Sequence, residues 1–236
     1  MAIAYGATLL GEFVSTGGGG TTITTSGSYA PTSNELICVF IHGDAVSNGD
    51  DEAPSGLTAN SLSWTNRAEV ACQSGWDNIS LWTALGASPS SSTMQASYTN
   101  SQEGAEFSIF EFSGINTTTP IVQTATNGPT SATSMTVTLG AFSDAGNATI
   151  GGFGRLNGSV NTSTPGTGFT EIYDGGNDYG DWAAIMATQY QLANDTSVDC
   201  SWSGSYNVGG IAAEIAVAAA GGFQAAWARN ANTIIG

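Results

Sequence analysis

The chain has 236 residues and a formal net charge of −16, with three arginines, no lysine and one histidine against 19 acidic side chains. This charge argues against binding to DNA or RNA, because nucleic-acid affinity depends on Lys and Arg side chains that neutralise phosphates. It also argues against an enzyme, since nucleophile activation and proton transfer near neutral pH rely largely on His, Lys and Arg.

The composition predicts a single all-β domain. Hydrophobic residues make up 41% of the chain, enough for a packed core, and helix formers such as Lys, Arg, Glu, Gln and Met are scarce beside Gly, Ser and Thr. Sandwiches often run to about 200–250 residues as one domain. We therefore expect an antiparallel, jelly-roll-like β-sandwich over residues 1–220, with residues 1–20 as an N-terminal arm, followed by a C-terminal tail over residues 221–236.

The start of the chain gives no export or membrane signal. Residues 1–6 lack the basic and apolar regions of a secretory signal, and no segment has the ~18 apolar residues of a membrane span. We therefore expect no membrane contact, and either a protein that works in the cytoplasm or one that leaves the cell by lysis as part of a particle.

Short runs of β-branched and aromatic residues alternate with clusters of Gly, Ser, Asn, Asp and Pro, which is typical of a sandwich. The predicted strands cover residues 35–41, 57–64, 68–72, 79–85, 94–98, 106–112, 134–139, 148–153, 169–173, 182–190, 197–202 and 210–217. Residues 107–112 predict a strand covered on both faces, whereas residues 135–139 alternate and predict one wet face. The four glycines at 17–20 predict a turn or the joint of the arm, beside an edge strand at 21–25.

The cysteines and the histidine offer little reactive chemistry in sequence. Cys38, Cys72 and Cys200 are widely spaced, without a C-x-x-C pair or a second histidine, so we expect neither a zinc site nor a disulfide framework. Cys38 lies in an apolar run and predicts a buried thiol. His42 ends that run, and with Asp44 and a serine it could form a hydrolase triad. No Gly-x-Ser-x-Gly elbow accompanies it, so we interpret His42 as a solvated residue at a strand end.

Paired carboxylates of a glycosidase are the other catalytic arrangement that a sandwich can carry. Most acids of this chain fall in predicted loops, and only Glu106, Glu111 and Glu214 lie among apolar strand neighbours. No spacing signature joins these three residues. We therefore do not expect glycosidase activity.

Calcium is the more credible ligand, because residues 44–52 and residues 174–181 each gather oxygen ligands and glycines. The candidate calcium ligands of the second segment are Asp174, Asn177, Asp178 and Asp181. Neither segment has the alternate ligand positions and final Glu of an EF-hand. The alternative, which we favour, is that both are solvated acidic loops that keep the protein soluble, with no cofactor.

Aromatic residues suggest two kinds of contact surface. Trp76 and Tyr179 lie in polar or Gly-rich stretches and are the candidate glycan contacts, whereas most other rings fall in apolar strands where burial is expected. In the tail, Phe223, Trp227 and Arg229 follow a pair of glycines. We expect these three residues to form an interface with a neighbouring subunit.

Five segments share the strand and turn pattern of one group of sandwiches: residues 34–41, 79–82, 110–115, 119–121 and 148–153. The most specific of these is residues 110–115, a strand followed by a Ser-Gly-Ile turn. In these segments the chain resembles a recurrent β-sandwich of extracellular bacterial proteins and tailed-phage structural proteins, with concanavalin-like or jelly-roll topology.

In phages such domains serve as head decoration (cement) proteins, or as modules of tail and fibre proteins. The resemblance implies a non-enzymatic virion protein, and the lack of heptads and fibre-like repeats favours the outer capsid over a fibre. Its expected partners are the major capsid protein and copies of itself, for example in a trimer, after assembly in the host cytoplasm. The alternative is a carbohydrate-binding or adhesion module of a phage tail or fibre that holds a host surface glycan.

Overall fold

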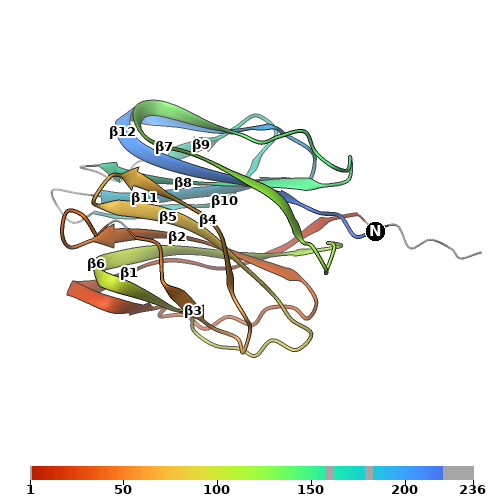
Figure 1. Ribbon diagram of the computed structural model, residues 1–236, viewed down its shortest axis with the longest axis horizontal. Helices are drawn as coiled ribbons and strands as arrows, with labels where there is room; N and C mark the ends of the chain where they lie inside the picture. Colours follow the sequence, from red (N-terminus) through yellow and green to blue (C-terminus); the bar gives the residue numbers. More distant parts are fainter. Residues whose placement is uncertain (1, 51, 158–161, 179–182, 220–236) are drawn as a thin grey trace, which may run out of the picture.

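The computed structural model describes residues 2–50, 52–157, 162–178 and 183–219. These residues form two six-stranded antiparallel sheets that pack face to face, as Figure 1 shows. The prediction of an all-β antiparallel sandwich is therefore confirmed. Among the described residues there is no helix long and apolar enough to cross a membrane.

The first sheet is built from the first half of the chain. Its strands are β1 (Ala4–Thr24), β2 (Leu36–Ala45), β3 (Gly56–Thr58), β4 (Thr65–Gln73), β5 (Asp77–Leu85) and β6 (Gln95–Ser113). They lie in the order β1-β6-β2-β5-β4, and β3 pairs with β6. Residues 4–20, predicted as an arm, form the first part of β1, in which the pairing with β6 shifts register across the glycines between Ser15 and Gly20.

The second sheet is built from the second half of the chain. Its strands are β7 (Ile121–Thr138), β8 (Ala148–Asn157), β9 (Ser163–Pro165), β10 (Thr170–Asp178), β11 (Ala183–Gln191) and β12 (Ser197–Ile215). Read from β7, they lie in the order β7-β12-β8-β11-β10, and β9 pairs with β12. Each strand of this sheet therefore takes the place that the strand six numbers earlier takes in the first sheet.

The two halves of the chain thus share one architecture. The strands β2 and β8 have ten residues each, and β6 and β12 have nineteen each. The register agrees as well, because Leu36 at the start of β2 lies opposite Phe112, and Ala148 at the start of β8 lies opposite Ile215. Contacts between the sheets also come in equivalent pairs, β4 with β7 and β1 with β10, β5 with β8 and β2 with β11. We conclude that the sandwich is a structural duplication, in which one six-stranded architecture occurs twice along the chain with approximate two-fold symmetry.

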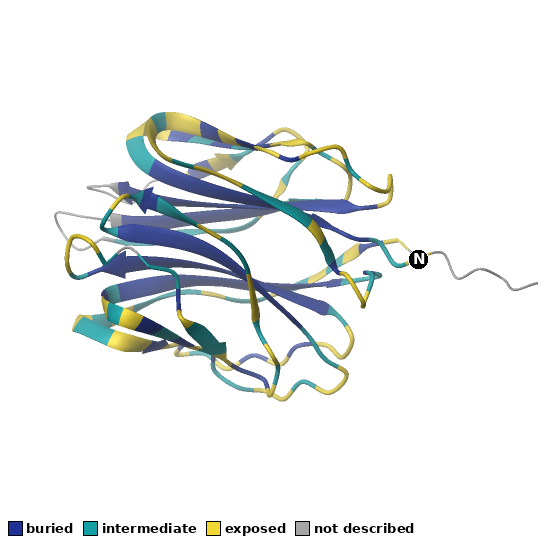
Figure 2. Cartoon of the chain, viewed as in Figure 1, coloured by how far each residue is buried: buried dark blue, intermediate teal, exposed yellow. Residues whose placement is uncertain are grey.

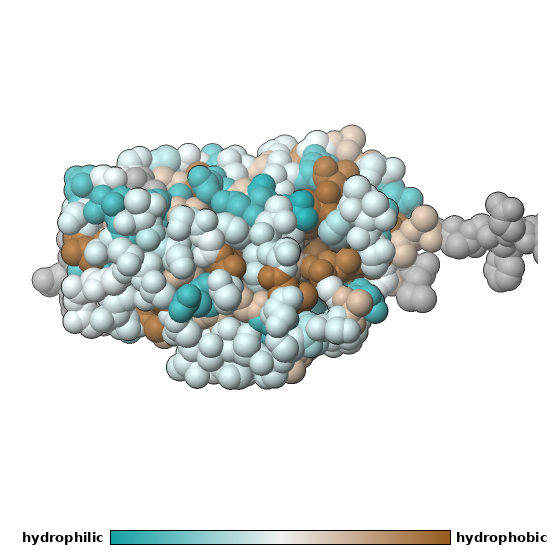
Figure 3. Space-filling view, turned by 60° about the horizontal axis from the view of Figure 1, so that its bottom comes forward, coloured by the Kyte–Doolittle hydropathy of each residue, from teal (hydrophilic) through white to brown (hydrophobic). Residues whose placement is uncertain are grey.

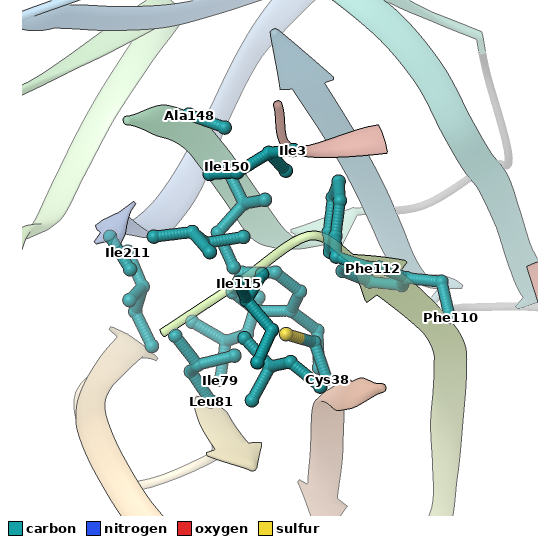
Figure 4. Close-up of a cluster of buried hydrophobic side chains, with 14 of the residues drawn as sticks. Ile3, Cys38, Ile79, Leu81, Phe110, Phe112, Ile115, Ala148, Ile150 and Ile211 are labelled. Atoms are coloured by element: carbon teal, nitrogen blue, oxygen red, sulfur yellow. The ribbon is translucent and has the colours of Figure 1, made fainter. Parts of the chain in front are cut away.

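Buried side chains form three hydrophobic clusters. The central cluster lies between the sheets and includes Cys38, Phe110, Phe112, Ile150 and Ile211. Figure 4 shows its side chains, most of them aliphatic or aromatic, pointing toward one another. The other two lie on the outer face of each sheet, where the long strands β1 and β6, or β7 and β12, bend over it. The middle strands are therefore covered on both sides, as the dark ribbons of Figure 2 show, and β2 is buried along its whole length.

Two predicted burial patterns are confirmed, one in the inner strand β6 and one at the end of the edge strand β7. Residues 107–112 are buried on both faces, as predicted, and residues 135–139 alternate between buried and exposed side chains, as predicted. The predicted strands at 94–98 and 106–112 are parts of one strand, β6. The placement of His42 at a solvated strand end is wrong, because β2 continues to Ala45 and the His42 side chain is fully buried between the sheets.

Candidate functional site

A cluster of polar side chains is buried between the two sheets. His42 from β2, Cys72 from β4, Asp77 from β5 and Glu106 from β6 are each 0% exposed, and the half-buried Tyr173 from β10 reaches them from the second sheet. They lie on the inward face because alternate residues of a strand point to the same side, the side that also carries Phe40 and Phe110. We call these five residues the His42 cluster.

Two carboxylates flank the imidazole ring of His42. Its Nε2 lies 2.9 Å from Asp77 Oδ2, and its Nδ1 lies 3.6 Å from Glu106 Oε2. Asp77 Oδ1 accepts a hydrogen bond from the backbone N–H of Gln73 at 2.7 Å, and Glu106 Oε1 accepts one from the Tyr173 hydroxyl at 3.4 Å. The ring is therefore held by Asp77 through Nε2, while Nδ1 faces the Glu106 carboxylate beyond hydrogen-bond distance.

Burial and charge act on these groups in opposite directions. Burial alone lowers the pKa of His42, but Cys72, the hydrogen bond to Asp77 and the nearby Glu106 outweigh it and hold this pKa well above its ordinary value. Burial raises the pKa of Glu106 to about 7, although His42 and Tyr173 partly offset the effect. Burial also raises the pKa of the Cys72 thiol. At neutral pH His42, and in part Glu106, therefore hold protons that the same groups would lose in water.

The second half of the chain makes room for this cluster. Its residues at the positions equivalent to His42, Glu106 and Asp77 are small: Gly154, Gly209 and Ala184. A Cβ atom on Gly154 would lie 2.7 Å from both Cys72 Sγ and His42 Cδ2, closer than carbon atoms can approach. The polar side chains of the first half thus fit between the sheets because the equivalent residues of the second half are glycine or alanine.

The chemistry available to the His42 cluster is limited by its burial. Cysteine, histidine and aspartate are the groups of a thiol hydrolase, but such an enzyme needs its nucleophile in contact with substrate. Here the Cys72 and His42 side chains have no solvent exposure. In this conformation the cluster can hold protons or a metal ion, but it cannot attack a substrate.

A small hollow opens at the same end of the sandwich. It has a volume of about 60 Å³ and is lined by Asp44, Ala45, Trp76, Glu103 and Leu156. Asp44 lies two residues beyond His42, and burial raises the pKa of its carboxyl group to about 7, an effect that His42 partly offsets. Trp76, a candidate glycan contact, is half-buried at the wall of this hollow.

A second polar cluster lies in the core of the second half. The fully buried Arg155 donates from Nη2 to Ser163 Oγ at 2.6 Å, and its guanidinium carbon lies 4.9 Å from the centre of the Trp202 ring. The carboxylate of Asp174 accepts hydrogen bonds from the Ser163 backbone N–H at 2.7 Å and from its hydroxyl at 3.0 Å. Asp174, a candidate calcium ligand, is thus occupied by a serine that also binds Arg155.

The other candidate calcium ligands of this segment are Asn177, Asp178 and Asp181, and of these the structure describes the side chain of Asn177. Asp174, Asn177 and Asp178 belong to β10, which extends five residues beyond the predicted strand. Asp174 and Asn177 are three residues apart in a regular stretch of that strand, so their side chains point to opposite faces. Asp181 lies outside the described residues, as do Tyr179, Phe223, Trp227 and Arg229.

Sequence reasoning did not find the His42 cluster, because its residues come from five strands and share no local motif. Only two signals were present: a single histidine at the end of an apolar run, and Glu106 among apolar neighbours. Both are polar residues where burial is expected, which marks either a paired group or a site. Joining them to Cys72 and Asp77 requires the strand register.

No family model, curated protein or solved structure matches this chain. Its function is therefore inferred from its own residues and their arrangement.

Proposed function

We propose that this chain is a non-enzymatic structural protein of a virion, a decoration (cement) protein on the outer head of a tailed phage. It would bind the major capsid protein and copies of itself, after assembly in the host cytoplasm. The observation that carries this proposal is the division between interior and surface: the histidine and cysteines are buried, and short polar side chains cover the outside.

The surface supports a role in coating. Figure 3 shows a face that is mostly pale, the colour of residues near neutral hydropathy such as Gly, Ser and Thr, with small brown patches between them. Among the described residues the exposed large hydrophobic side chains are Val122 and Leu192. Arg155 is buried, which leaves the described surface with Arg67 as its arginine. Contacts of such a surface would depend on shape and hydrogen bonds more than on ion pairs.

The phage setting is supported by the resemblance of residues 34–41, 79–82 and 110–115. These cover the start of β2 with the two residues before it, part of β5, and the end of β6 with the turn that follows it. The duplicated sandwich adds a physical reason, because two sheets joined by a continuous core form a rigid block. A rigid block can bridge neighbouring capsid subunits without losing conformational entropy on binding.

The test is to add the purified chain to phage heads that lack it and to measure occupancy by cryo-electron microscopy. Binding at regular surface positions, with heads that withstand higher temperature, is the expected result. Absence from heads, or a location in tail fibres, would overturn the proposal. A chain shortened by residues 221–236 tests the tail: we expect weaker occupancy or self-association, and unchanged occupancy would exclude the tail as the anchor.

A second candidate function is adhesion to a host glycan. It is favoured by the hollow in which Trp76 lies beside Asp44 and Glu103, since a ring and carboxylates can together contact a sugar. A glycan array on the purified chain tests it, with W76A as the variant that should lose binding and W64A as a half-buried tryptophan control elsewhere in the first half. Binding that survives W76A would exclude this site.

A further inference from the structure

We propose that His42, Cys72 and Asp77 bind a zinc ion between the two sheets, with Glu106 orienting the histidine. The donor atoms, an imidazole nitrogen, the Cys72 sulfur and a carboxylate oxygen, all lie within 4.8 Å of one another. Nitrogen, sulfur and oxygen donors in one small group are the set that Zn²⁺ accepts. The sequence predicted no zinc site, because the three residues are 30 and five positions apart and belong to different strands.

The carboxylate on the far side of the ring is an independent observation. A histidine that binds zinc through one nitrogen usually donates the N–H of the other to a carboxylate, which fixes the ring. Here Nε2 faces Asp77 and Cys72, while Nδ1 faces Glu106 Oε2 at 3.6 Å. Neither Nδ1 nor Oε2 has a hydrogen-bond partner in the described part of the chain. A small closing of this gap would make the hydrogen bond that a zinc-bound histidine requires.

The spacing of the donor atoms is also close to what an ion needs. Gly154 has no side chain to crowd these donors, since a Cβ atom there would lie 2.7 Å from Cys72 Sγ and 3.1 Å from His42 Nε2. Zinc sits about 2.3 Å from sulfur and about 2.0 Å from nitrogen. Two light-atom donors of a tetrahedral ion lie about 3.3 Å apart. The 2.9 Å between Nε2 and Asp77 Oδ2 therefore needs to open by only a few tenths of an ångström.

Charge and protons balance in this site. Binding would replace the proton on the Cys72 thiol, and any proton on Nε2, and both protons would pass to solvent. A thiolate and a carboxylate would then neutralise the two charges of the ion, and Nδ1–H would face Glu106. The three ligands come from the adjacent strands β2, β4 and β5, so the ion would join three strands of the first sheet. It would stabilise the fold whatever surface the protein covers.

The test uses the full chain, without a histidine tag, expressed in zinc-supplemented medium and analysed for metal by mass spectrometry. We expect about one Zn²⁺ per chain, and at least about tenfold less in C72S and H42Q. C200S is the matched control, because Cys200 is a buried thiol in the other half of the chain, and it should keep the metal. The variant E106Q should weaken zinc affinity by about tenfold, since it acts through the histidine.

A spectroscopic measurement on the wild-type chain tests the site even if the variants do not fold. Refolding the wild-type chain with Co²⁺ should give a thiolate-to-cobalt charge-transfer band in the near ultraviolet, and Zn²⁺ should remove it. A folded wild-type chain with no zinc and no such band would overturn the proposal. Equal zinc in wild type and C72S would also overturn it.

Discussion

Glu111 and Glu214 occupy equivalent positions in the two halves of the chain, and each holds the loop that precedes the central strand of its sheet. Glu111 accepts hydrogen bonds from the Thr32 backbone N–H and hydroxyl, both at 2.8 Å. Glu214 accepts the same pair from Ser143, both at 3.1 Å. Glu111 lies opposite Ile37, the second residue of β2, and Glu214 lies opposite Thr149, the second residue of β8.

This correspondence shows that the duplication includes specific contacts as well as topology. The loops that the two carboxylates hold lead into β2 and β8, which run in the middle of the sandwich. Most other equivalent positions differ, since β2 reads LICVFIHGDA and β8 reads ATIGGFGRLN. The shared carboxylate therefore marks a requirement of the architecture, whereas the residues between the sheets differ in the two halves and fit one another.

Replacing either carboxylate with the amide should destabilise the fold. The variants E111Q and E214Q keep the size of the side chain but place an NH₂ group among donors, so buried N–H groups lose an acceptor. We expect each to lower the free energy of unfolding by about 1–3 kcal/mol in urea denaturation at neutral pH. E69Q, an exposed glutamate on β4, is the control and should stay within about 0.5 kcal/mol of wild type. If only one of the two variants were destabilised, the two glutamates would not have equivalent roles.

Phe40 and Gly152 show how the two halves fit together. They are equivalent positions of β2 and β8, and a Cβ atom on Gly152 would lie 2.4 Å from a ring carbon of Phe40. G152A should therefore force the sheets apart and cost about 1–3 kcal/mol. G56A is the control, because a Cβ atom there meets nothing within 4 Å.

A double variant tests whether the cost arises from this contact. In F40L/G152A the smaller, flexible side chain should recover part of the loss, so that the two changes are not additive in urea denaturation. Additive losses would mean that the glycine is required for another reason.

Much of the fold follows from local pattern. The strand over residues 107–112 was predicted with both faces covered because its apolar residues do not alternate, and residues 135–139 were predicted with one wet face because theirs do. These segments are read correctly because burial of a strand depends on its own side chains.

The duplication and the His42 cluster could not be predicted in the same way. The equivalent residues Phe40 and Gly152 share no chemistry, so the repeat is visible only in the pairing of strands. His42 was interpreted as solvated because three polar or small residues, Gly43, Asp44 and Ala45, follow it, whereas the strand continues through them. Polar groups can be buried when they form hydrogen bonds to one another across strands, although the local sequence pattern predicts that they are exposed.

The buried Arg155 should be essential to the second half. R155M keeps an unbranched side chain but removes the hydrogen bond to Ser163 and the contact with the Trp202 ring, beside a carboxylate at Asp174. The change also removes the positive charge that interacts with Asp174, so we expect a loss of about 3 kcal/mol in urea denaturation. R67M, at a half-exposed arginine with a hydrogen bond to Thr83, should cost less than about 1 kcal/mol. Similar losses for both variants would contradict the role of Arg155.

Lysine should not replace Arg155. The ammonium group of R155K lacks the planar fork that reaches several acceptors and stacks on a ring, so most of the loss should remain. Recovery of wild-type stability in R155K would show that charge alone is required at this position.

The contribution of Glu214 should depend on pH. Burial alone raises the pKa of this carboxyl group, but hydrogen bonds from Asn147, Gln123 and Ser143 outweigh it and lower the pKa below the ordinary value of 4.5. A depressed pKa means that the unfolded chain takes up the proton first as pH falls. The stabilisation is therefore complete above pH 4.5 and is lost as pH falls through the pKa of the folded state.

The amide variant measures this contribution directly. The difference in unfolding free energy between wild type and E214Q should be about 1–3 kcal/mol at pH 7. It should shrink steadily as pH falls from 4.5 through the lower pKa of the folded state, below which both side chains are uncharged. Urea denaturation at a series of pH values gives this difference, with E69Q as the control that tracks wild type throughout. A difference that stays constant down to strongly acidic pH would mean that Glu214 stabilises the loop through shape and not through its charge.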